Sequence, residues 1–386
     1  MSDNDYIVFG KPDIQPPEMA EVMDSLKKNW LGTGPKVKRF EEAFAAYKGV
    51  GTNQVAAVNS CTAALHLSLL ASGVQPGDEV ITTAMTFCAT VNAIIHAGAT
   101  PVLVDVCEDS FNIDPEAIAA AITPRTRAIV PVHFAGNSCD MHAIMALAEK
   151  HDLKVIEDCA HALESEFAGK ALGTFGDYGC FSFYATKNIT TGEGGMVVAR
   201  SEQAISRIKT LALHGMSTDA WARFSDEGYK HYQVTEVGFK YNMMDLQAAI
   251  GIHQLARIEP RWHSRQALFA LYCEAFADMP VQLPVALDDG ARPAFHLFPI
   301  LLEEGLPVSR DQFMVRAHKQ HMGTGVHYLS IPTHPYYQAR FGWQPDAYPV
   351  ADRIGRTTVS LPFSPALTEA QINRVIDVTR SLVLND

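Results

Sequence analysis

Positively charged residues are scarce in this sequence. The 386 residues include 31 Lys and Arg against 43 Asp and Glu, and the formal net charge is −12. A chain with this balance has no broad basic surface to attract nucleic acid or an anionic membrane. We therefore expect a phosphorylated ligand to bind at a local site made of backbone N–H groups and a few cations.

Segments that carry a chain into or across a membrane are also missing. Residues 1–19 show no basic stretch followed by an apolar run, so we predict no signal peptide. No apolar run approaches the roughly 20 residues that span a bilayer. Together these absences predict a cytoplasmic protein that has neither a membrane nor a nucleic acid as its partner.

Motifs for metals and dinucleotides are absent as well. The seven cysteines contain no C-x-x-C pair and mostly lie in apolar stretches, as reduced core cysteines do. Cys159 and His161 have side chains that suit zinc, but no second Cys/His pair has zinc spacing, so we predict no metal site. No G-x-G-x-x-G opens a helix after the first predicted strand, which argues against an NAD site.

Short apolar segments do alternate with amphipathic ones between about residues 50 and 200. The pattern predicts strands at 54–58, 79–83, 100–106, 127–134 and 153–158, and helices at 61–73, 87–98, 114–122 and 140–151. Asp114 and Asp140 stand at N-cap positions, and Pro115 follows Asp114 at a first helical position. This alternation predicts an α/β fold whose mostly parallel sheet is covered on both faces and binds ligands at the carboxyl ends of its strands.

The rest of the chain follows a different pattern. Two apolar runs, 179–184 and 194–200, are separated by a loop without a crossover helix, and the long helical stretch after them is expected to break at Pro260. Further elements are predicted as strands at 295–302 and 323–330 and helices at 309–322 and 368–383. These elements indicate a smaller α+β domain at the C-terminal end.

The segment NSCTAAL, residues 59–65, joins a predicted strand to a helix through small and hydroxylated residues. A helix N-terminus of this kind presents free N–H groups, hydroxyls and a positive dipole end to an anion such as phosphate. The pattern also suits a simple N-cap at Ser60 or Thr62, and the segment taken alone favours the cap.

The segment VIEDCAHA, residues 155–162, ends a predicted strand with two carboxylates. Alternation sends Glu157 and Asp158 to opposite faces, so only one of them can point at a given ligand. A carboxylate in this place can hold a protonated ring nitrogen, bind a metal or cap the next segment. His161 suits a structural hydrogen bond as well as a functional one.

A third segment, FYATKNITTGEGGM, surrounds Lys187 with small residues and follows it with three glycines. A lysine in a pocket can form a Schiff base, because burial lowers the pKa of the amine toward the nucleophilic form. Ser182 and Thr186 have hydroxyls that can donate to a phosphate. A solvated loop lysine is the alternative when the segment is taken alone.

The three segments together match what pyridoxal phosphate (PLP) requires of a protein. The turn holds the phosphate, the carboxylate keeps the pyridine nitrogen protonated and the lysine forms the aldimine. Phe87, at the end of the neighbouring strand in TAMTFCAT, can stack on the ring or belong to the core.

Residues from about 6 to 383 resemble the DegT-type sugar aminotransferases, which are PLP enzymes. The motifs that carry the resemblance follow in order along the chain: LGTGPKVKRFE, NSCTAALHLSL, GDEVITTAMTFCAT, VIEDCAHA, GCFSFYATKNITTGEGGMV and GFKYNMMDLQAAIG. The resemblance implies aminotransferase fold type I. It also implies a large PLP-binding domain over 1–250, with a substrate segment over 1–35, and a small α+β domain over 251–386.

The same resemblance implies a role for each matching residue. Lys187 matches the aldimine lysine, and Asp158 rather than Glu157 matches the carboxylate at the pyridine nitrogen. The remaining cofactor positions are the phosphate-binding turn (Cys61, Thr62 and Ala63), the hydroxyl on that phosphate (Ser182), the aromatic on the ring face (Phe87), the neighbour of the phenolic oxygen (His161) and a phosphate contact from the adjacent subunit (Asn242). This last contact implies a homodimer with shared active sites.

Substrate segments point to one branch of the family. A branch that dehydrates sugars at C3 has histidine where this chain has Lys187, so amino transfer is favoured. The segments HGMSTDAWARF and GTGVHYLSIPTHPYYQARFGW resemble the branch that acts on UDP-linked 4-keto sugars, such as the enzyme making UDP-4-amino-4-deoxy-L-arabinose. The resemblance implies substrate contacts at Thr33, His214 and His327, although His327 also suits a structural role.

The reaction that the resemblance implies is a ping-pong transamination. L-Glutamate supplies the amino group, pyridoxamine phosphate (PMP) carries it, and a nucleotide-linked keto sugar receives it. The alternatives are an aminotransferase for a 3-keto nucleotide sugar or a cyclitol ketone, which would use the same cofactor residues, and a PLP-binding protein without turnover. Polysaccharide biosynthesis, lipid A modification and antibiotic sugars are all open as pathways.

Overall fold

The computed structural model describes residues 6–216, 232–285, 290–302 and 305–384. Residues 217–224 of the segment HGMSTDAWARF therefore lie outside the described residues. Among the described helices, none is both long and apolar enough to cross a membrane.

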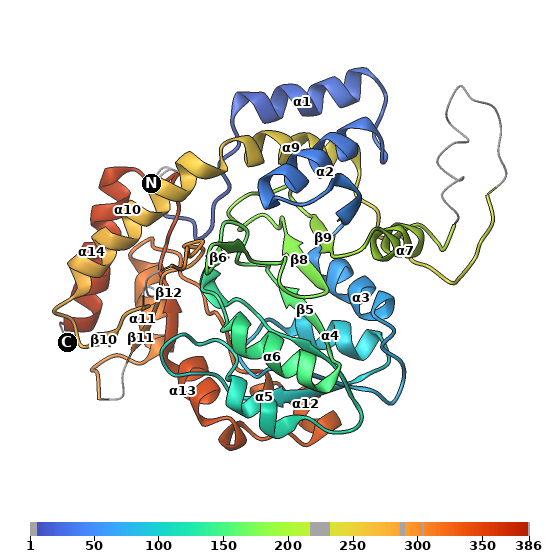
Figure 1. Cartoon of the computed structure of the whole chain (residues 1–386). Helices are drawn as coiled ribbons and strands as arrows, with labels where there is room; N and C mark the ends of the chain where they lie inside the picture. Colours follow the sequence, from blue (N-terminus) through green and yellow to red (C-terminus); the bar gives the residue numbers. More distant parts are fainter. Residues whose placement is uncertain (1–5, 217–231, 286–289, 303–304, 385–386) are drawn as a thin grey trace.

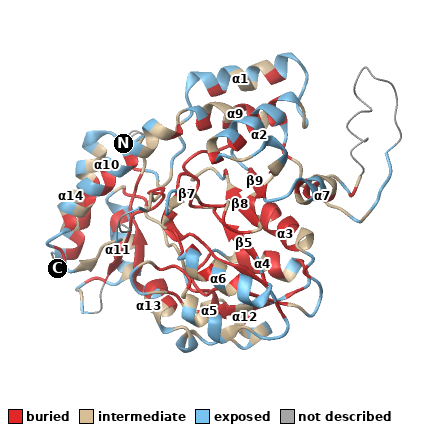
Figure 2. Ribbon diagram, viewed as in Figure 1, coloured by how far each residue is buried: buried red, intermediate tan, exposed pale blue. Residues whose placement is uncertain are grey.

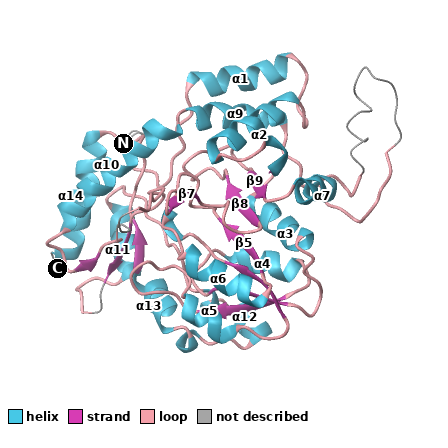
Figure 3. Ribbon diagram, in the orientation of Figure 1, coloured by secondary structure: helices cyan, strands magenta, loops and turns pink. Residues whose placement is uncertain are grey.

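The described residues form helices around a central sheet, with a second group of elements beside it (Figures 1 and 3). The helices are α1 (Pro16–Lys27), α2 (Pro35–Lys48), α3 (Cys61–Ala71), α4 (Cys88–His96), α5 (Pro115–Ala121), α6 (Met141–His151), α7 (Glu202–Ala212), α9 (Asp245–Ala256), α10 (Ile258–Phe276), α11 (Arg310–Lys319), α12 (Pro335–Phe341), α13 (Pro349–Thr357) and α14 (Glu369–Leu384). The strands are β1 (Val55–Val58), β2 (Glu79–Thr83), β3 (Thr100–Val104), β4 (Thr126–Val130), β5 (Lys154–Asp158), β6 (Glu166–Phe167), β7 (Lys170–Ala171), β8 (Tyr178–Ser182), β9 (Gly195–Ala199), β10 (Val281–Gln282), β11 (Pro299–Leu302) and β12 (Thr358–Ser360). Single 3₁₀ turns are η1 (Thr52–Gln54), η2 (Phe134–Gly136), η3 (Ile331–Thr333) and η4 (Pro345–Ala347).

The central sheet has seven strands in the order β1-β9-β8-β5-β4-β2-β3. The pairs from β8 through β5, β4 and β2 to β3 are parallel, while β9 is antiparallel to both β8 and β1. The mostly parallel sheet predicted from the alternation is therefore confirmed. An antiparallel pair needs no crossover helix, so β8 runs into β9 through the loop that contains Lys187.

Both faces of this sheet are covered, as a parallel sheet requires. Helices α2, α5, α6 and α9 pack on one face, and α3, α4 and α7 pack on the other. Along β1, Val55 and Ala57 join the first core while Ala56 and Val58 join the second, as the alternation of strand side chains demands. Buried residues are accordingly concentrated in the strands and on the helix faces toward them (Figure 2).

Helices of the central region begin where the sequence predicts caps. Asp114 Oδ1 accepts the Glu116 N–H at 2.8 Å, and Asp140 Oδ1 accepts the Ala143 N–H at 3.0 Å. Each bond satisfies one of the backbone donors that a helix start leaves without an intrahelical partner. The N-cap prediction is confirmed at both residues.

The C-terminal elements have a core of their own. Strands β10, β11 and β12 form an antiparallel sheet, against which α10, α11 and α14 pack. A further cluster joins this part to the central region, where Leu297 and Ile354 contact residues such as Met85 and Phe134. The predicted domain boundary between residues 250 and 251 falls inside α9, and the two-domain division stays a prediction.

One predicted strand, 323–330, is wrong. Gly325 exchanges two backbone hydrogen bonds with Ser360 at 2.8 and 3.0 Å, but the segment pairs no further with β12. Its neighbour Gly323 donates its N–H to the Ile7 carbonyl at 2.9 Å instead. Because its backbone groups bond to the N-terminal segment rather than to one continuous partner, the segment stays irregular.

The long helical stretch breaks earlier than predicted. Helix α9 ends at Ala256 and α10 begins at Ile258, so Pro260 lies in the first turn of α10. Proline is tolerated there because first-turn N–H groups have no intrahelical acceptor. The break itself is confirmed, and its position moves to Arg257, where φ is −109° and ψ is 12°.

Glu157 connects β5 to the turn that leads into β8. Its Oε1 accepts the N–H groups of Phe175 and Gly176 at 2.8 and 2.7 Å. Its Oε2 accepts the N–H of Gly173 at 2.7 Å and lies 3.2 Å from Nε2 of His133. Burial alone would raise the pKa of this fully buried carboxyl, but the hydrogen bonds from His133 and the backbone outweigh it and the pKa is lowered. Glu157 is therefore a structural anion that holds the sheet edge together.

The substitution Glu157→Gln tests this role. In the variant, the amide NH₂ would replace one carboxylate oxygen and would face N–H groups that need an acceptor. Loss of the buried charge and of these hydrogen bonds costs about 3–5 kcal/mol. We expect the free energy of unfolding, measured by urea denaturation, to fall by that amount. The exposed control Glu116→Gln should stay within about 0.5 kcal/mol of the wild type. A Glu157→Gln protein as stable as this control would contradict the assignment.

Candidate active site

A cavity of about 550 Å³ lies at the carboxyl ends of β5 and β8, where α3 also begins. Its position matches the rule that ligands bind at strand ends in α/β sheets. The residues around it are Ser60, Cys61, Thr62, Leu65, Phe87, Ala89, Thr90, Asp158, Ala160, Ser182, Tyr184, Thr186, Lys187, Glu193, Gly194, His327 and Tyr328. Seven of the predicted site residues are among them, namely Lys187, Asp158, Cys61, Thr62, Phe87, Ser182 and His327.

Lys187 extends from the β8–β9 loop into this cavity. Its backbone N–H donates to the Tyr184 carbonyl at 2.9 Å, which closes a turn just after β8. Burial lowers the pKa of its amine to about 8, although Cys61 and Asp158 act in the opposite direction. With this pKa about a tenth of the amine is unprotonated at pH 7, far more than for an ordinary lysine, and the unprotonated amine is the nucleophilic form.

Asp158 ends β5 and is only 4% exposed. Its Oδ1 accepts the Ala160 N–H at 3.1 Å, and its Oδ2 accepts the Thr90 hydroxyl at 2.9 Å. Burial raises the pKa of this carboxyl, while these two hydrogen bonds and the charge of Lys187 counteract the rise. The carboxylate has no ion-pair partner within 4.0 Å among the residues that the structure describes. A cation in the cavity would therefore be stabilised beside it.

The turn at the start of α3 also lines the cavity, beside Lys187 and Asp158. Ser60 is the N-cap, and its Oγ accepts the Ala63 N–H at 3.1 Å. The N–H of Ala63 is thereby occupied, and Ala63 does not line the cavity, whereas Cys61 and Thr62 do. These residues stand in the first turn of an 11-residue helix, where free N–H groups and the helix dipole favour an anion. The N-cap interpretation is thus confirmed at Ser60, and the anion site stays a prediction that this geometry allows.

Gly195 keeps this turn in place from the neighbouring strand. It pairs with Val58 of β1 on one side and with Ser182 of β8 on the other. A Cβ on Gly195 would lie 2.5 Å from the Ser60 carbonyl carbon and 2.8 Å from the Cys61 nitrogen. The absence of a side chain therefore lets β9 approach the turn backbone closely.

His161 is buried behind the cavity rather than lining it. Its Nδ1 accepts the Ala135 N–H at 3.2 Å, and its Nε2 lies 2.8 Å from the Tyr328 hydroxyl. Burial, with the nearby charge of Lys187, holds the pKa of the imidazole well below its usual range. A neutral ring that accepts at Nδ1 carries its proton on Nε2, so it donates to Tyr328. The hydroxyl proton of Tyr328 is then available to a group in the cavity.

Phe87 and His327 also line the cavity. The ring of Phe87 is 56% exposed and lies 5.8 Å from that of Tyr328, centroid to centroid. His327 is held by a 2.8 Å contact between its Nδ1 and the Ser360 hydroxyl. Burial, with the nearby charge of Lys187, lowers the pKa of His327 to about 3. His327 is therefore neutral at physiological pH.

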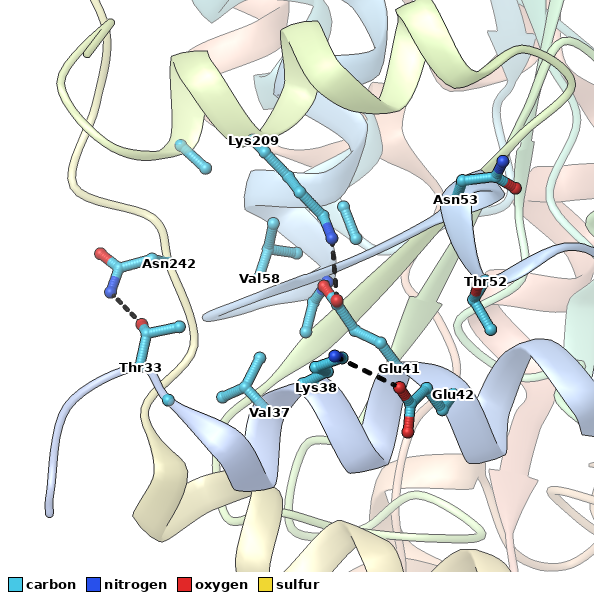
Figure 4. Close-up of a pocket in the computed structure, with 14 residues that line it drawn as sticks. Thr33, Val37, Lys38, Glu41, Glu42, Thr52, Asn53, Val58, Lys209 and Asn242 are labelled. Atoms are coloured by element: carbon cyan, nitrogen blue, oxygen red, sulfur yellow. Dashed lines mark hydrogen bonds and ion pairs between the residues drawn. The ribbon is translucent and has the colours of Figure 1, made fainter. Parts of the chain in front are cut away.

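Thr33 and Asn242 line a different cavity of about 410 Å³, which lies between α2, β1 and α7 (Figure 4). The Asn242 Nδ2 donates to Thr33 Oγ1 at 2.6 Å, while its Oδ1 is buried without a hydrogen-bond partner. Two lysines of this cavity are paired with carboxylates, Lys209 with Glu41 at 2.8 Å and Lys38 with Glu42 at 3.9 Å. Within one chain, neither Thr33 nor Asn242 lines the Lys187 cavity.

His214 also lies outside both cavities. It follows α7 with a positive φ of 58°, and its backbone N–H donates to the Phe239 carbonyl at 2.8 Å. The predicted roles of His214, Thr33 and Asn242 as contacts of substrate or cofactor stay predictions.

Among the cavity residues with polar side chains, four were not predicted from the sequence: Thr90, Tyr184, Glu193 and Tyr328. Thr90 lies in the first turn of α4, and its hydroxyl is 2.8 Å from that of Thr86, which precedes the helix. Tyr328 was hidden by the wrong strand prediction. In a strand, His327 and Tyr328 would point to opposite faces, but in the irregular segment both line the cavity.

Three buried side chains that suit metals also meet behind the cavity. Ligand atoms of His133, Glu157 and Cys159 lie within 4.8 Å of one another. The Glu157 oxygens already accept four hydrogen bonds, and His133 Nδ1 accepts the Cys139 N–H at 3.1 Å. Burial raises the pKa of the Cys159 thiol well above its ordinary range, which favours the protonated form. The cluster is therefore a hydrogen-bonded part of the fold.

Comparison with known proteins places the whole chain among sugar-modifying enzymes. The model of the DegT/DnrJ/EryC1/StrS aminotransferase family matches residues 12–380. The spore coat polysaccharide biosynthesis protein SpsC of Bacillus subtilis (strain 168) is 44% identical over 382 residues, which cover 98% of each chain.

Solved structures agree with this match. The putative sugar aminotransferase Spr1654 from Streptococcus pneumoniae, solved in PLP and PMP forms, has a TM-score of 0.91 at 30% identity and 98% coverage of both chains. Helicobacter pylori PseC, an aminotransferase involved in the biosynthesis of pseudoaminic acid, has a TM-score of 0.90 at 28% identity, with 98% of this chain and 99% of that chain covered. Fold type I is thus confirmed.

The residues around the cavity fit PLP. Asp158 offers a buried carboxylate without a cationic partner, which suits a protonated ring nitrogen. The start of α3 suits a phosphate, and the amine of Lys187 suits covalent attachment. Phe87 would cover one face of the ring.

The substitution Gly195→Ala is expected to weaken PLP binding. The added methyl group must displace the backbone of Ser60 and Cys61, and overpacking of this kind costs about 1–3 kcal/mol, or roughly 5-fold to 150-fold in Kd. Fluorescence titration of the apo protein with PLP measures the change. In the control Gly32→Ala, no heavy atom lies within 4 Å of the added Cβ, so its Kd should match the wild type. Equal affinities for all three proteins would refute the role of Gly195.

The pKa of Lys187 predicts how fast the apo protein attaches PLP covalently. Only the unprotonated amine reacts, so the rate should rise with pH up to about 8 and level off above it. Stopped-flow absorbance between pH 6 and 10 follows this phase, which should be missing from Lys187→Ala. A rate that is still rising tenfold per pH unit at pH 10 would show that the amine keeps the ordinary lysine pKa of 10.5.

Proposed function

Because this chain belongs to the DegT/DnrJ/EryC1/StrS aminotransferase family and is therefore a PLP-dependent transaminase, we propose that it moves an amino group from L-glutamate to a nucleotide-linked 4-keto sugar. The observation that carries the proposal is the meeting of Lys187, Asp158 and the start of α3 around one cavity. The reaction is ping-pong, with PMP as the form that carries the amino group between the two halves.

The cofactor, when bound, supplies an electron sink that lets a proton leave the donor's α-carbon. The chain's residues direct this chemistry. With PLP bound, Asp158 would accept a hydrogen bond from the ring nitrogen and favour its protonated form. The amine of Lys187 would serve as the base that takes a proton from the donor's α-carbon and as the acid that returns it to the cofactor. Its lowered pKa suits both directions of this transfer near neutral pH.

Tyr328 and His161 act as a pair in this proposal. His161 is a positioning residue, because it donates to the Tyr328 oxygen and fixes the phenol at the cavity wall. The Tyr328 O–H then donates to an oxygen of the cofactor or substrate. Burial, with the nearby charge of Asp158, raises the pKa of the phenol, so the donor keeps its proton.

Sugar as the acceptor is supported by what similar proteins are named for. SpsC is described as a polysaccharide biosynthesis protein, and PseC takes part in the biosynthesis of pseudoaminic acid. The cavity of about 550 Å³ lies within the range of volumes that small-molecule and cofactor sites have. The 4-keto position and the UDP group rest on the resemblance of the substrate segments.

A homodimer with shared active sites completes the proposal. Asn242 has a buried Oδ1 without a partner and faces the cavity of Figure 4 rather than Lys187 of its own chain. Such an arrangement suits a residue that reaches the cofactor phosphate of an adjacent subunit.

The substitution Lys187→Ala tests the function. We expect the visible absorbance of the covalently attached cofactor to disappear and turnover to fall by at least about 10³-fold, since the proton carrier is lost. The control Lys150→Ala changes an exposed lysine on α6 and should leave both unchanged.

The acceptor is identified by offering the wild type three ketones with L-glutamate: a UDP-4-keto sugar, a 3-keto nucleotide sugar and a cyclitol ketone. Mass spectrometry of the products then shows which ketone is aminated. Amination of the 3-keto sugar or cyclitol alone would replace the proposed substrate. A cofactor spectrum that no amino donor changes would instead indicate a PLP-binding protein without turnover.

A further inference from the structure

Asn188 directly follows Lys187, and its side chain is buried, with 6% of the residue exposed. Its Nδ2 lies 2.9 Å from each carboxylate oxygen of Glu164 and 2.9 Å from the Ala294 carbonyl oxygen. Its Oδ1 lies 2.8 Å from Nδ1 of His296. A side-chain amide offers two N–H donors and one carbonyl acceptor, so every polar group of this amide is engaged.

These partners leave the Asn188 amide a single orientation. A carboxylate and a backbone carbonyl can only accept, so the NH₂ group must face Glu164 and Ala294, and the oxygen must face His296. His296 therefore carries its proton on Nδ1 and donates it to Asn188. Burial, with the nearby charges of Lys187 and Arg265, holds the pKa of this imidazole well below its usual range, so the ring is neutral.

Glu164 is a buried carboxylate that depends on this amide. It is 2% exposed and lies in the segment between β5 and β6. Burial raises its pKa, while the charge of Arg265 and the hydrogen bond from Asn188 act in the opposite direction. Loss of that donor would leave a buried carboxylate poorly satisfied, which is costly. The amide and the carboxylate thus hold each other in place.

The partners of Asn188 belong to segments that are themselves fixed to η2. The segment 294–296 donates two backbone N–H groups to carbonyls of η2, at 3.0 and 3.1 Å. Ser165, next in the chain to Glu164, donates its hydroxyl to the Gly136 carbonyl of the same turn at 2.7 Å. Asn188 therefore joins the β8–β9 loop to a frame made of segments that are far apart in the sequence.

Other hydrogen bonds near Lys187 close the loop on itself. The N–H of Lys187 donates to the Tyr184 carbonyl at 2.9 Å, and the N–H of Thr191 donates to the Phe183 carbonyl at 2.9 Å. These bonds shape the loop but do not tie it to Glu164 or to the segment 294–296. The Asn188 side chain supplies that connection, one residue from the amine-bearing lysine.

We propose that Asn188 is a positioning residue, which fixes the backbone of Lys187 so that the amine reaches both the cofactor and the α-carbon of the amino donor. This rests on the proposed function, since it assigns a further residue to that reaction. The lysine stem is flexible, so the fold can fix only its backbone end. A misplacement of about 1 Å at the reacting atoms can cost on the order of 10²-fold in rate.

The substitution Asn188→Asp keeps the shape of the side chain but removes both N–H donors and places a second carboxylate beside Glu164. The loop must move to relieve the repulsion. We expect the limiting rate of the half-reaction with L-glutamate, followed by the loss of visible absorbance of the PLP form, to fall about 10²-fold. The glutamate concentration at half-maximal rate should change by less than about threefold, since this residue does not touch the cavity of the substrate.

A second substitution at Glu164 should rescue this variant. In Glu164→Gln/Asn188→Asp the amide and the carboxylate exchange places, so a hydrogen bond joins positions 164 and 188 again and the pair keeps one negative charge. The limiting rate should recover at least about tenfold over Asn188→Asp, and Glu164→Gln alone completes the double-mutant cycle. A double variant no faster than Asn188→Asp, or an Asn188→Asp protein with the wild-type rate, would overturn the proposal.

Asn112→Asp is the matched control, because Asn112 is another buried and fully bonded amide. It is 2% exposed, its Nδ2 donates to the carbonyls of residues 137 and 138 at 3.2 and 2.8 Å, and its Oδ1 accepts the Phe134 N–H at 2.8 Å. None of these residues lines the Lys187 cavity. Thermal unfolding should show a loss of stability in both variants, whereas the rate should fall only in Asn188→Asp. An equal fall in rate would indicate an effect of stability alone and refute the positioning role.

Covalent attachment of PLP to the apo protein tests Asn188 without an amino donor. Its rate, measured by stopped-flow absorbance, should fall at least about tenfold in Asn188→Asp and recover in the double variant. Attachment at the wild-type rate in Asn188→Asp would contradict the proposal. A wild type that attaches PLP but does not react with L-glutamate would place the error in the donor of the proposed function, and the attachment rates would still decide the role of Asn188. If Asn188→Asp does not fold, Asn188→Ala, which removes the amide without adding a charge, replaces it in both rate measurements.

Discussion

The antiparallel pairing of β9 with β8 is the constraint on which the site depends. Strands β2, β3, β4 and β5 follow one another through the helices α4, α5 and α6, which carry the chain away from the strand ends. Strand β9 instead returns directly beside β8, so the connecting loop stays at the carboxyl edge and holds Lys187 next to Asp158 of β5. The same strand begins with Gly195, whose missing side chain lets the α3 turn approach. One pairing therefore brings together the amine, the carboxylate and the anion-binding turn.

Adjacent carboxylates at the end of β5 divide two tasks between them. Glu157 faces the side of the sheet where backbone N–H groups saturate it, and there its charge holds a turn in place. Asp158 faces the cavity, accepts hydrogen bonds from the Thr90 hydroxyl, the Ala160 N–H and, at 4.0 Å, the Cys61 thiol, and is left with a raised pKa because it is buried. A carboxyl that is both buried and incompletely satisfied favours a cationic ligand, while its neighbour makes the edge rigid.

The C-terminal part of the chain packs against the central region and contributes residues to the site. Tyr328 and His327 both come from residues beyond the sheet, and each lines the Lys187 cavity. His161 links the two parts, because its ring joins the Ala135 backbone to the Tyr328 hydroxyl. A relative movement of these parts would change the donor and acceptor positions around Lys187 together, which makes their packing part of the chemistry.

Local features of the sequence were sufficient for the central region. The strand–helix alternation, the caps at Asp114 and Asp140, and the strand-end positions of Asp158 and Lys187 depend on neighbours within a few residues, so periodicity and turn chemistry reveal them. The resemblance to a family added the choice between Glu157 and Asp158. Tertiary structure alone decided the irregular path of residues 323–330, the exposure of Tyr328 to the cavity and the hydrogen bonds of Asn188. Those features depend on partners more than 100 residues away along the chain, such as Ile7 for Gly323, His161 for Tyr328 and Ala294 for Asn188. Periodicity along the sequence cannot predict such contacts, because they form only when separate cores pack against each other.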